Sequence, residues 1–156
     1  MTIRRAVVSD IDRLSDLLSQ VLEVHHNARP DIFRTGGKKY TVPELIEILQ
    51  DDQRPIFVYE DEARGVCGYA FCIFVQHIDN NILTDIKTLY IDDLCVDREC
   101  RGMGIGRALY NYVVDFAKSE GCYNLTLNVW ADNVSALGFY ESLGLNKQKI
   151  GMEKIL

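Results

Sequence analysis

The most informative stretch for predicting the fold is Arg101-Gly102-Met103-Gly104-Ile105-Gly106-Arg107. It lies between a β-like run that ends at Val96 and an amphipathic helical pattern that begins near Gly104. Glycines let the backbone turn tightly and approach an anion closely. The free N–H groups and the positive dipole end of the following helix attract negative charge, and the two arginines would add charge-assisted hydrogen bonds. The stretch therefore predicts an anion-binding turn, which we call the glycine turn (residues 101–107).

Two familiar phosphate motifs fit this turn poorly. A Walker A site ends in Gly-Lys-Ser/Thr, and the glycine turn contains no lysine. A dinucleotide-binding fingerprint reads G-x-G-x-x-G early in its fold, whereas this turn reads G-x-G-x-G after two thirds of the chain. A strand-to-helix turn without a ligand stays open when the turn is considered alone.

Downstream of the turn, the sequence predicts alternating helices and strands. Apolar residues recur at i, i+3, i+4, i+7 and i+8 from Leu109 to Ala117, which is the spacing of one helical face. Gly121 and Gly144 are placed to end two helices. We expect a helix over 104–120, a strand over 125–129, a helix over 133–143 and a last strand near Met152.

Upstream, the pattern predicts two helices between strands. Ser9 with Asp12 suggests the N-cap of a first helix, and Thr41 with Glu44 suggests the capping box of a second. The expected strands cover residues 3–6, 56–59, 66–75 and 88–96, with an irregular segment at 27–39. The order of elements predicts an α/β (α+β) domain with a mixed sheet, in a single domain over residues 1–156.

Composition and net charge indicate which kinds of binding partner suit the chain. The chain has 156 residues, 47% of them hydrophobic and 26% charged, which is an ordinary globular balance. A net charge of −6 argues against nucleic acid and against a membrane surface, because binding phosphate needs clustered Lys and Arg. An acidic chain suits a cationic small-molecule substrate.

The cysteines and histidines point to a reducing compartment without a metal site. Five cysteines form no C-x-x-C pair, and His25, His26 and His77 lack the spacing of zinc ligands. No stretch is long and apolar enough for a signal peptide or a membrane span. We therefore expect a cytoplasmic protein and no metal.

The glycine turn and its surroundings resemble the GCN5-related N-acetyltransferase (GNAT) superfamily. Arg101-x-x-Gly104-x-Gly106 matches the superfamily's Arg/Gln-x-x-Gly-x-Gly/Ala pattern. The run Ile91–Asp97 is similar to the superfamily's fourth strand, and 127–144 resembles its N-x-x-A-x-x-F-Y-x-x-x-G block. The resemblance covers essentially the whole chain and implies a mixed, mostly antiparallel sheet flanked by helices.

The resemblance also implies acetyl-CoA as cosubstrate. A bulged fourth strand that splays from the fifth would offer its backbone to the pantetheine arm, and the turn amides would hold the pyrophosphate. Without the family, Asn133 is a helix N-cap and Phe139 a core aromatic residue; both interpretations are compatible. The implied binding residues are Leu94, Cys95, Val96, Arg101, Gly102, Met103, Gly104, Ile105, Gly106, Arg107, Asn133, Ala136 and Phe139.

The implied reaction is direct attack of a neutral amine on the thioester. Tyr140 matches the superfamily's general acid, although a core tyrosine at helical spacing stays open. An alkylamine with a pKa near ~10.4 must lose a proton, so a base is needed. Asp92 and Asp93 are candidates, and as neighbours on a strand their side chains are expected on opposite faces. A solubilising role for these carboxylates and a water chain as base both remain open.

The acceptor class is the least determined feature. Members that acetylate ribosomal-protein N-termini often have Glu where this chain has Asn128, so a small-molecule amine ranks above a protein lysine or N-terminus. The acceptor pocket should involve the first helix, residues 25–40 and the turn at 77–83. Alternatives are a non-catalytic acyl-CoA-binding regulatory module and an interaction domain without a nucleotide ligand. A homodimer stays open, since no sequence feature decides it.

Overall fold

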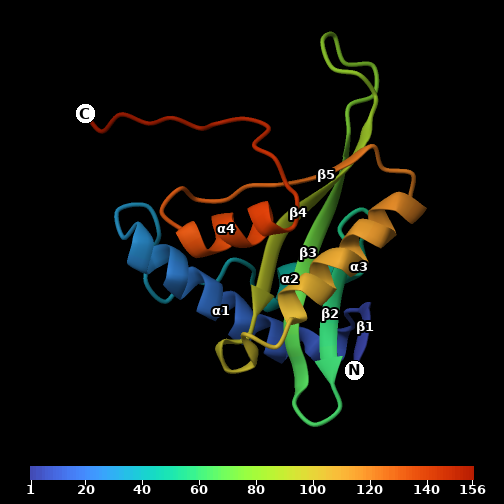
Figure 1. Ribbon diagram of the computed structural model, residues 1–156. Coiled ribbons are helices and arrows are strands. Elements are labelled where there is room, and N and C mark those ends of the chain that lie inside the picture. The colour runs from blue at the N-terminus through green and yellow to red at the C-terminus, as the bar shows by residue number, and fades with distance from the viewer.

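The structure is a computed structural model that describes residues 1–156 (Figure 1). Its elements follow the predicted order, with most boundaries within two residues of expectation. They are β1 (Thr2–Arg5), a 3-10 turn (Val8–Asp10), α1 (Ile11–Ala28), α2 (Val42–Leu49), β2 (Ile56–Asp61), β3 (Gly65–Gln76), β4 (Lys87–Val96), a 3-10 turn (Arg98–Cys100), α3 (Ile105–Ser119), β5 (Asn124–Leu127) and α4 (Val134–Ser142).

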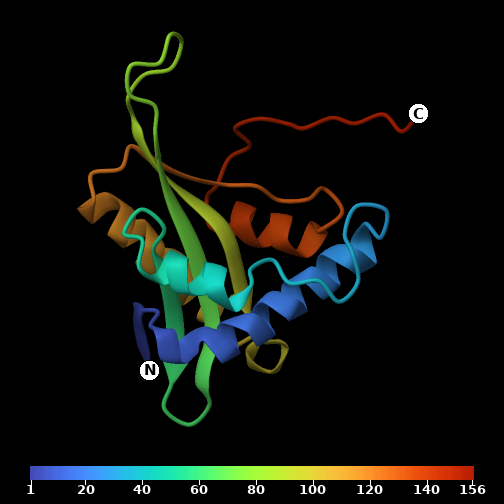
Figure 2. The same ribbon diagram turned by 180° about the vertical axis from the view of Figure 1, so that it is seen from behind.

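A five-stranded sheet in the order β1-β2-β3-β4-β5 forms the centre of the molecule. The first four strands pair antiparallel and β5 pairs parallel to β4, which confirms the predicted mixed, mostly antiparallel sheet. Helices α1 and α2 cover one face and α3 covers the other, as the two opposite views show (Figures 1 and 2). β3 is buried over much of its length because it is packed on both sides.

Each face of the sheet has its own apolar core. Leu14, Leu18 and Leu45 of α1 and α2 pack with Val58 and Tyr69 on the first face. The second face is a cluster that joins Phe57, Ala70, Cys72, Leu89, Ile91, Val113 and Ala117. The amphipathic patterns of the helices are therefore satisfied against the sheet.

A β-bulge in β4 and the short pairing of β5 open the sheet at one point. Phe71 is opposite Asp93 and Cys72 is opposite Ile91, so Asp92 is the extra residue of β4. β5 pairs with β4 only over residues 88–91, and the later part of β4 has no partner from β5. The bulge and splay implied by the family resemblance are thus confirmed.

The expected last strand near Met152 is wrong. Residues 143–156, which we call the C-terminal segment, form no strand and extend from the body of the molecule (Figure 1). No neighbouring strand pairs with this segment, and an unpaired strand is not stable in water. Arg29 instead ties it to the end of α1, with Nη1 2.5 Å from Glu153 Oε1.

The predicted N-cap at Ser9 is also wrong, whereas the second cap is confirmed. Ser9 lies inside a 3-10 turn, and Asp10 accepts a hydrogen bond from the Val7 N–H (2.8 Å) and pairs with Arg4 (2.7 Å). At α2, Thr41 N–H donates to Glu44 Oε2 (2.7 Å) and the Glu44 N–H donates back to Thr41 Oγ1 (3.4 Å). This is the predicted capping box.

All five cysteines are free thiols. Cys67, Cys72, Cys95 and Cys100 are buried and Cys122 is partly buried. Burial raises the pKa of Cys67 to about 11 and the pKa of Cys72 and Cys95 to about 12. No helix in the structure is both long enough and apolar enough to cross a bilayer.

Candidate functional site

The glycine turn presents a run of unused backbone donors. Gly102 (φ 77°) and Gly104 (φ 78°) are both in the left-handed region, which favours glycine. No backbone hydrogen bond within the chain uses an N–H group from Gly102 to Arg107, and the first helical bond of α3 runs from Ala108 N–H to Gly104 C=O (3.0 Å). These donors and the N-terminal end of the α3 dipole fit an anion.

Ion pairing and hydrogen bonds fix the loop that leads into the turn. The Asp97 carboxylate accepts from the Glu99 N–H (2.9 Å) and pairs with Arg13 of α1, while the Asp97 N–H donates to the Cys67 carbonyl (2.8 Å). Asp97 is buried, so its charge is held by these partners. The loop thus joins β4 to α1 and β3 before the turn begins.

The free edge of β4 leads from the turn to the bulge. Because the Asp97 N–H faces β3, alternation along an antiparallel strand directs the N–H groups of Leu94 and Val96 to the other, unpaired side. The Cys95 side chain is buried against α1, with its thiol 3.7 Å from the Leu17 carbonyl. Ile105 is also buried, so Cys95 and Ile105 can meet a ligand only through their backbones.

Helix α4 packs beside the glycine turn. The Asn133 side-chain oxygen accepts from the Ala136 N–H (3.1 Å), which confirms Asn133 as the N-cap of α4. A Cβ at Gly106 would lie 3.3 Å from the Phe139 ring, so the absent side chain lets α4 approach α3 closely. Arg101, Met103 and Arg107 are exposed at this end of the molecule.

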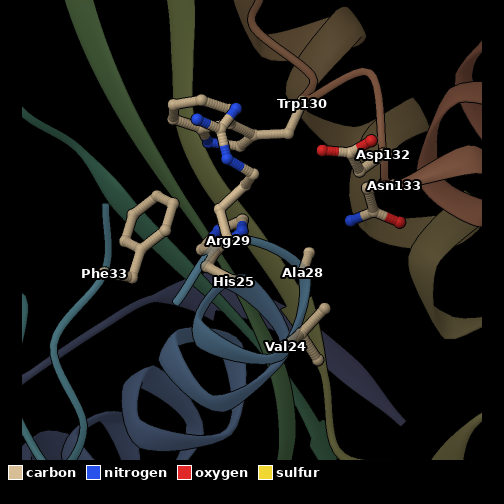
Figure 3. A pocket seen from close by; sticks show the side chains of 8 residues that line it. All are labelled: Val24, His25, Ala28, Arg29, Phe33, Trp130, Asp132 and Asn133. Carbon is tan, nitrogen blue, oxygen red and sulfur yellow. The ribbon is translucent and has the colours of Figure 1, made fainter. Parts of the chain in front are cut away.

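A small pocket separates the end of α1 from the β5–α4 loop (Figure 3). His25 and Phe33 stack with ring centroids 5.0 Å apart, and Trp130 meets Phe33 edge-on at 5.2 Å. Burial and the nearby Lys39 charge lower the pKa of His25, which favours a neutral imidazole. The pocket lies beside the larger cleft and shares His25, Arg29, Phe33, Trp130 and Asp132 with it.

The larger cleft brings the three proposed catalytic residues together. Asp92, Asp93 and Tyr140 all line it, together with parts of α1, the irregular segment after α1, β5 and the C-terminal segment. Sequence reasoning placed the two carboxylates on opposite faces, and this is wrong. Lys39 Nζ lies 3.0 Å from Asp92 Oδ2 and 3.7 Å from Asp93 Oδ2, so both carboxylates face one ammonium. The bulge breaks the two-residue alternation and turns both side chains to one side.

The surroundings of Asp93 and Tyr140 raise the pKa of both side chains. Burial raises the pKa of Asp93 to about 6, opposed by the Lys39 charge and by the Tyr69 hydroxyl, which donates to Asp93 at 3.2 Å. Burial, and then the Asp93 charge, raise the pKa of Tyr140 above its ordinary value. Asp93 can therefore change protonation near neutral pH while Tyr140 keeps its proton.

The sequence predicted that residues 25–40 contribute to the acceptor pocket, but it singled out none of the groups around the carboxylates. Lys39 and Tyr40 come from the irregular residues 29–41, which we call the α1–α2 segment, and the Tyr40 hydroxyl donates to Asp92 at 2.7 Å. Tyr69 lies fully buried on β3. A loop of this length between two helices was the one available signal that the segment could reach a site. The structure shows no cluster of His, Cys, Asp or Glu side chains arranged to hold a metal ion.

Comparison with known proteins assigns the chain to a family. It belongs to the acetyltransferase (GNAT) family, whose model matches residues 20–145. A crystal structure of a tetramutant of the BH1408 protein from Bacillus halodurans superposes with a TM-score of 0.95 at 34% identity, covering 100% of both chains.

Curated relatives share less of their length with this chain. An uncharacterised N-acetyltransferase of Methanocaldococcus jannaschii is 26% identical over 96% of this chain and 62% of that protein. The Arabidopsis thaliana glucosamine 6-phosphate N-acetyltransferase is 30% identical over 66% of each chain. The chain thus spans less than two thirds of the length of these relatives.

Proposed function

We propose that this chain transfers the acetyl group of acetyl-CoA to a primary amine, with a small-molecule acceptor favoured. The main support for the proposal is that an anion-binding turn, a free strand edge and a cleft with ionisable side chains follow one another without interruption. The unused amides of the glycine turn lead along the free edge of β4 to a cleft that holds Asp93 and Tyr140. Membership of the acetyltransferase family supports the same activity.

The residues present fit the cosubstrate. The N–H groups of residues 102–107 would bind the pyrophosphate, and Arg101 and Arg107 would add charge. Leu94 and Val96 would pair through their backbones with the pantetheine amides, continuing the sheet where β5 departs. Asn133, Ala136 and Phe139 would line the other side of the arm. Acetyl-CoA would supply an activated acyl group in a thioester.

Three groups of this chain would divide the chemistry. Asp93 would accept a proton from the incoming ammonium, because a carboxylate with a pKa near 6 is ionised at neutral pH yet still basic. The N–H of Leu94, fixed beyond the bulge, would donate to the thioester oxygen as charge develops there. Tyr140 would give its proton to the departing sulfur. The N–C bond forms as the C–S bond breaks, and the second proton lost by the nitrogen restores the Tyr140 hydroxyl.

The acceptor proposal rests on charge. Two adjacent carboxylates at the cleft suit an amine that arrives as an ammonium, and the chain is acidic as a whole. Asn128 lies just past β5, and its amide donates to the Tyr90 hydroxyl (3.2 Å), so position 128 offers no carboxylate. The Arabidopsis relative acts on glucosamine 6-phosphate, according to its name, which supports a small amine.

A protein N-terminus is the second candidate acceptor. The Escherichia coli ribosomal-protein bS18 alanine N-acetyltransferase is 36% identical to this chain over 69 residues, 44% of this chain and 45% of that enzyme. Because the match covers less than half of each chain, that similarity supports the acetyltransferase activity more than it supports a protein N-terminus as acceptor.

The buried free thiols and the acidic net charge suit a cytoplasmic protein that binds neither nucleic acid nor membrane.

The test is release of the CoA thiol with panels of amino sugars, polyamines, amino acids and peptides, run beside calorimetry with CoA alone. We expect CoA binding, and turnover with at least one small amine. Tyr140→Phe should bind CoA as the unmodified chain does but lose about a hundredfold or more in turnover. Turnover of peptides alone would move the acceptor to proteins. CoA binding without any turnover would favour a regulatory module, and no CoA binding would refute the proposal.

A further inference from the structure

The chain's own lysine occupies the place that an acceptor ammonium would need. Lys39 Nζ lies 3.0 Å from Asp92 Oδ2 and 3.7 Å from Asp93 Oδ2, and it donates to the Asp92 carbonyl at 3.3 Å. It also lies 5.6 Å from the centre of the Tyr40 ring. Two carboxylates, a carbonyl and an aromatic ring form a site for an alkylammonium group.

This site lies next to the proposed reaction centre. The Asp92 carbonyl that accepts from Lys39 belongs to the bulge residue, two positions before Leu94. Two residues of extended chain span at most about 7 Å, so the Asp92 carbonyl that Lys39 contacts lies close along β4 to the N–H proposed to face the thioester oxygen. Asp93, the proposed base, contacts the same nitrogen.

The segment that carries Lys39 is irregular between two aromatic contacts, Phe33 with His25 and Tyr40 with Phe71. Residues 29–41 contain no helix or strand, and Gly36 has a φ of 64°. The Lys39 side chain is 36% exposed, so it has room to move. A shift of a few ångströms would take its nitrogen from the ion pair with Asp92 to a position from which it can attack the thioester. Lys38, its neighbour in sequence, lines the same cleft but is exposed and forms no ion pair with the carboxylates.

From this arrangement we propose that the protein acetylates itself at Lys39. The Lys39 ammonium gives up one proton to Asp93, and the neutral amine forms an N–C bond with the acetyl carbon while the C–S bond of acetyl-CoA breaks and Tyr140 protonates the sulfur. The nitrogen then loses its second proton, which restores the Tyr140 hydroxyl, and Asp93 releases its proton to solvent. The product is N-acetyl-Lys39 and free CoA. The inference rests on the proposed function, because the same residues perform the same step on an internal amine.

Acetylation would change the site that performs it. The neutral amide can no longer pair with Asp92 and Asp93, so both carboxylates become available to an external ammonium. Loss of the Lys39 charge also removes an effect that lowers the pKa of Asp93, which makes Asp93 a stronger base for the next acceptor. The modified protein should therefore bind a cationic acceptor better than the unmodified protein does.

The experiment uses the full chain with acetyl-CoA that carries an isotope-labelled acetyl group and no added amine. Peptide mass spectrometry follows the label at every lysine, and Lys38 is the matched internal control. We expect Lys39 to be labelled about a hundredfold faster than Lys38, at a first-order rate independent of protein concentration. Tyr140→Phe and Asp93→Asn should lower the Lys39 rate by about a hundredfold and leave the Lys38 rate unchanged.

The outcomes separate the inference from the proposed function. Labelling of Lys39 no faster than Lys38, or equally fast in Tyr140→Phe, overturns the inference even if external amines are turned over. Absence of CoA binding overturns both. If Lys39 already carries acetyl after purification, its absence from Tyr140→Phe protein prepared in parallel supports the inference, and its presence there overturns it. Lys39→Arg should abolish the label at position 39, while Lys38→Arg should leave it.

Discussion

The two ends of the proposed reaction site are built in different ways. At the end formed by the glycine turn, the groups offered to a ligand are backbone N–H groups of consecutive residues, fixed by a strand, a turn and a helix. At the acceptor end, side chains come together from segments far apart in the sequence. Asp92 and Tyr40, for example, are separated by 52 positions.

Because the two ends are built differently, a substitution can disable one end and leave the other end intact. A backbone site depends on conformation, so glycine replacements should weaken it through strain. A side-chain site depends on charge and protonation, so nearly isosteric replacements should disable it without disturbing the fold. Replacements at the two ends should therefore have separable effects on turnover and on CoA binding.

Asp93→Asn should separate the two ends most sharply. An amide cannot accept the ammonium proton, so turnover should fall by about a hundredfold or more while the Kd for CoA stays unchanged. Thiol release and calorimetry measure the two quantities. Asp92→Asn is the matched control and should cost less, because Asp92 is not the proposed base. Equal losses in both variants would remove Asp93 from that role.

Gly104→Ala and Gly121→Ala test the glycine turn. Both glycines have positive φ, 78° at the start of α3 and 72° just past its end, so each replacement should lower the free energy of unfolding by about 1–2 kcal/mol. Only Gly104→Ala should also weaken CoA binding. Urea denaturation and calorimetry give the two effects. A comparable loss of CoA affinity in both variants would mean that strain in α3, and not the turn, controls binding.

Asn133 begins α4, the helix that meets the glycine turn through Phe139 and the cleft through Tyr140, and two replacements divide its roles. Asn133→Ala removes the cap of α4 and should cost about 1 kcal/mol of stability. Asn133→Asp keeps an oxygen for the Ala136 N–H but loses the amide donor, so stability should hold while CoA binding weakens. Thermal unfolding with and without CoA checks both. Unchanged CoA affinity in both variants would restrict Asn133 to its capping role.

The smallest expected effect is a shift in the pH profile. Asp93 must be ionised to act as a base, so turnover should rise with pH through the pKa near 6. Lys39 lowers that pKa, and Lys39→Met should therefore move the rise to higher pH by a fraction of a unit. Titration of the Asp93 carboxyl by NMR without acetyl-CoA, so that Lys39 keeps its charge, measures the shift, with Lys38→Met as control. A shift to lower pH would contradict the assigned contact.

The same contrast explains what the sequence could predict. Period-2 and period-3.6 patterns located the strands and helices, and the glycine turn and the Asn133 cap were visible because their chemistry is local. Asp92 and Asp93 were misplaced because a single bulged residue reverses alternation. The family resemblance implied a bulge in this strand, but nothing in the local sequence marks which residue forms it. The Lys39 contact could not be predicted, since it depends on where a segment without periodicity folds back.

The burial of the cysteines has a practical consequence for any assay that counts released CoA. A thiol reagent reacts with thiolates, and the high pKa values of Cys67, Cys72 and Cys95 keep these groups protonated at neutral pH. The folded enzyme should therefore add little background to a colour reaction that reports thiols. Unfolding would expose all five at once, so the same reagent, without substrate, would count the fraction of molecules that have lost their native structure.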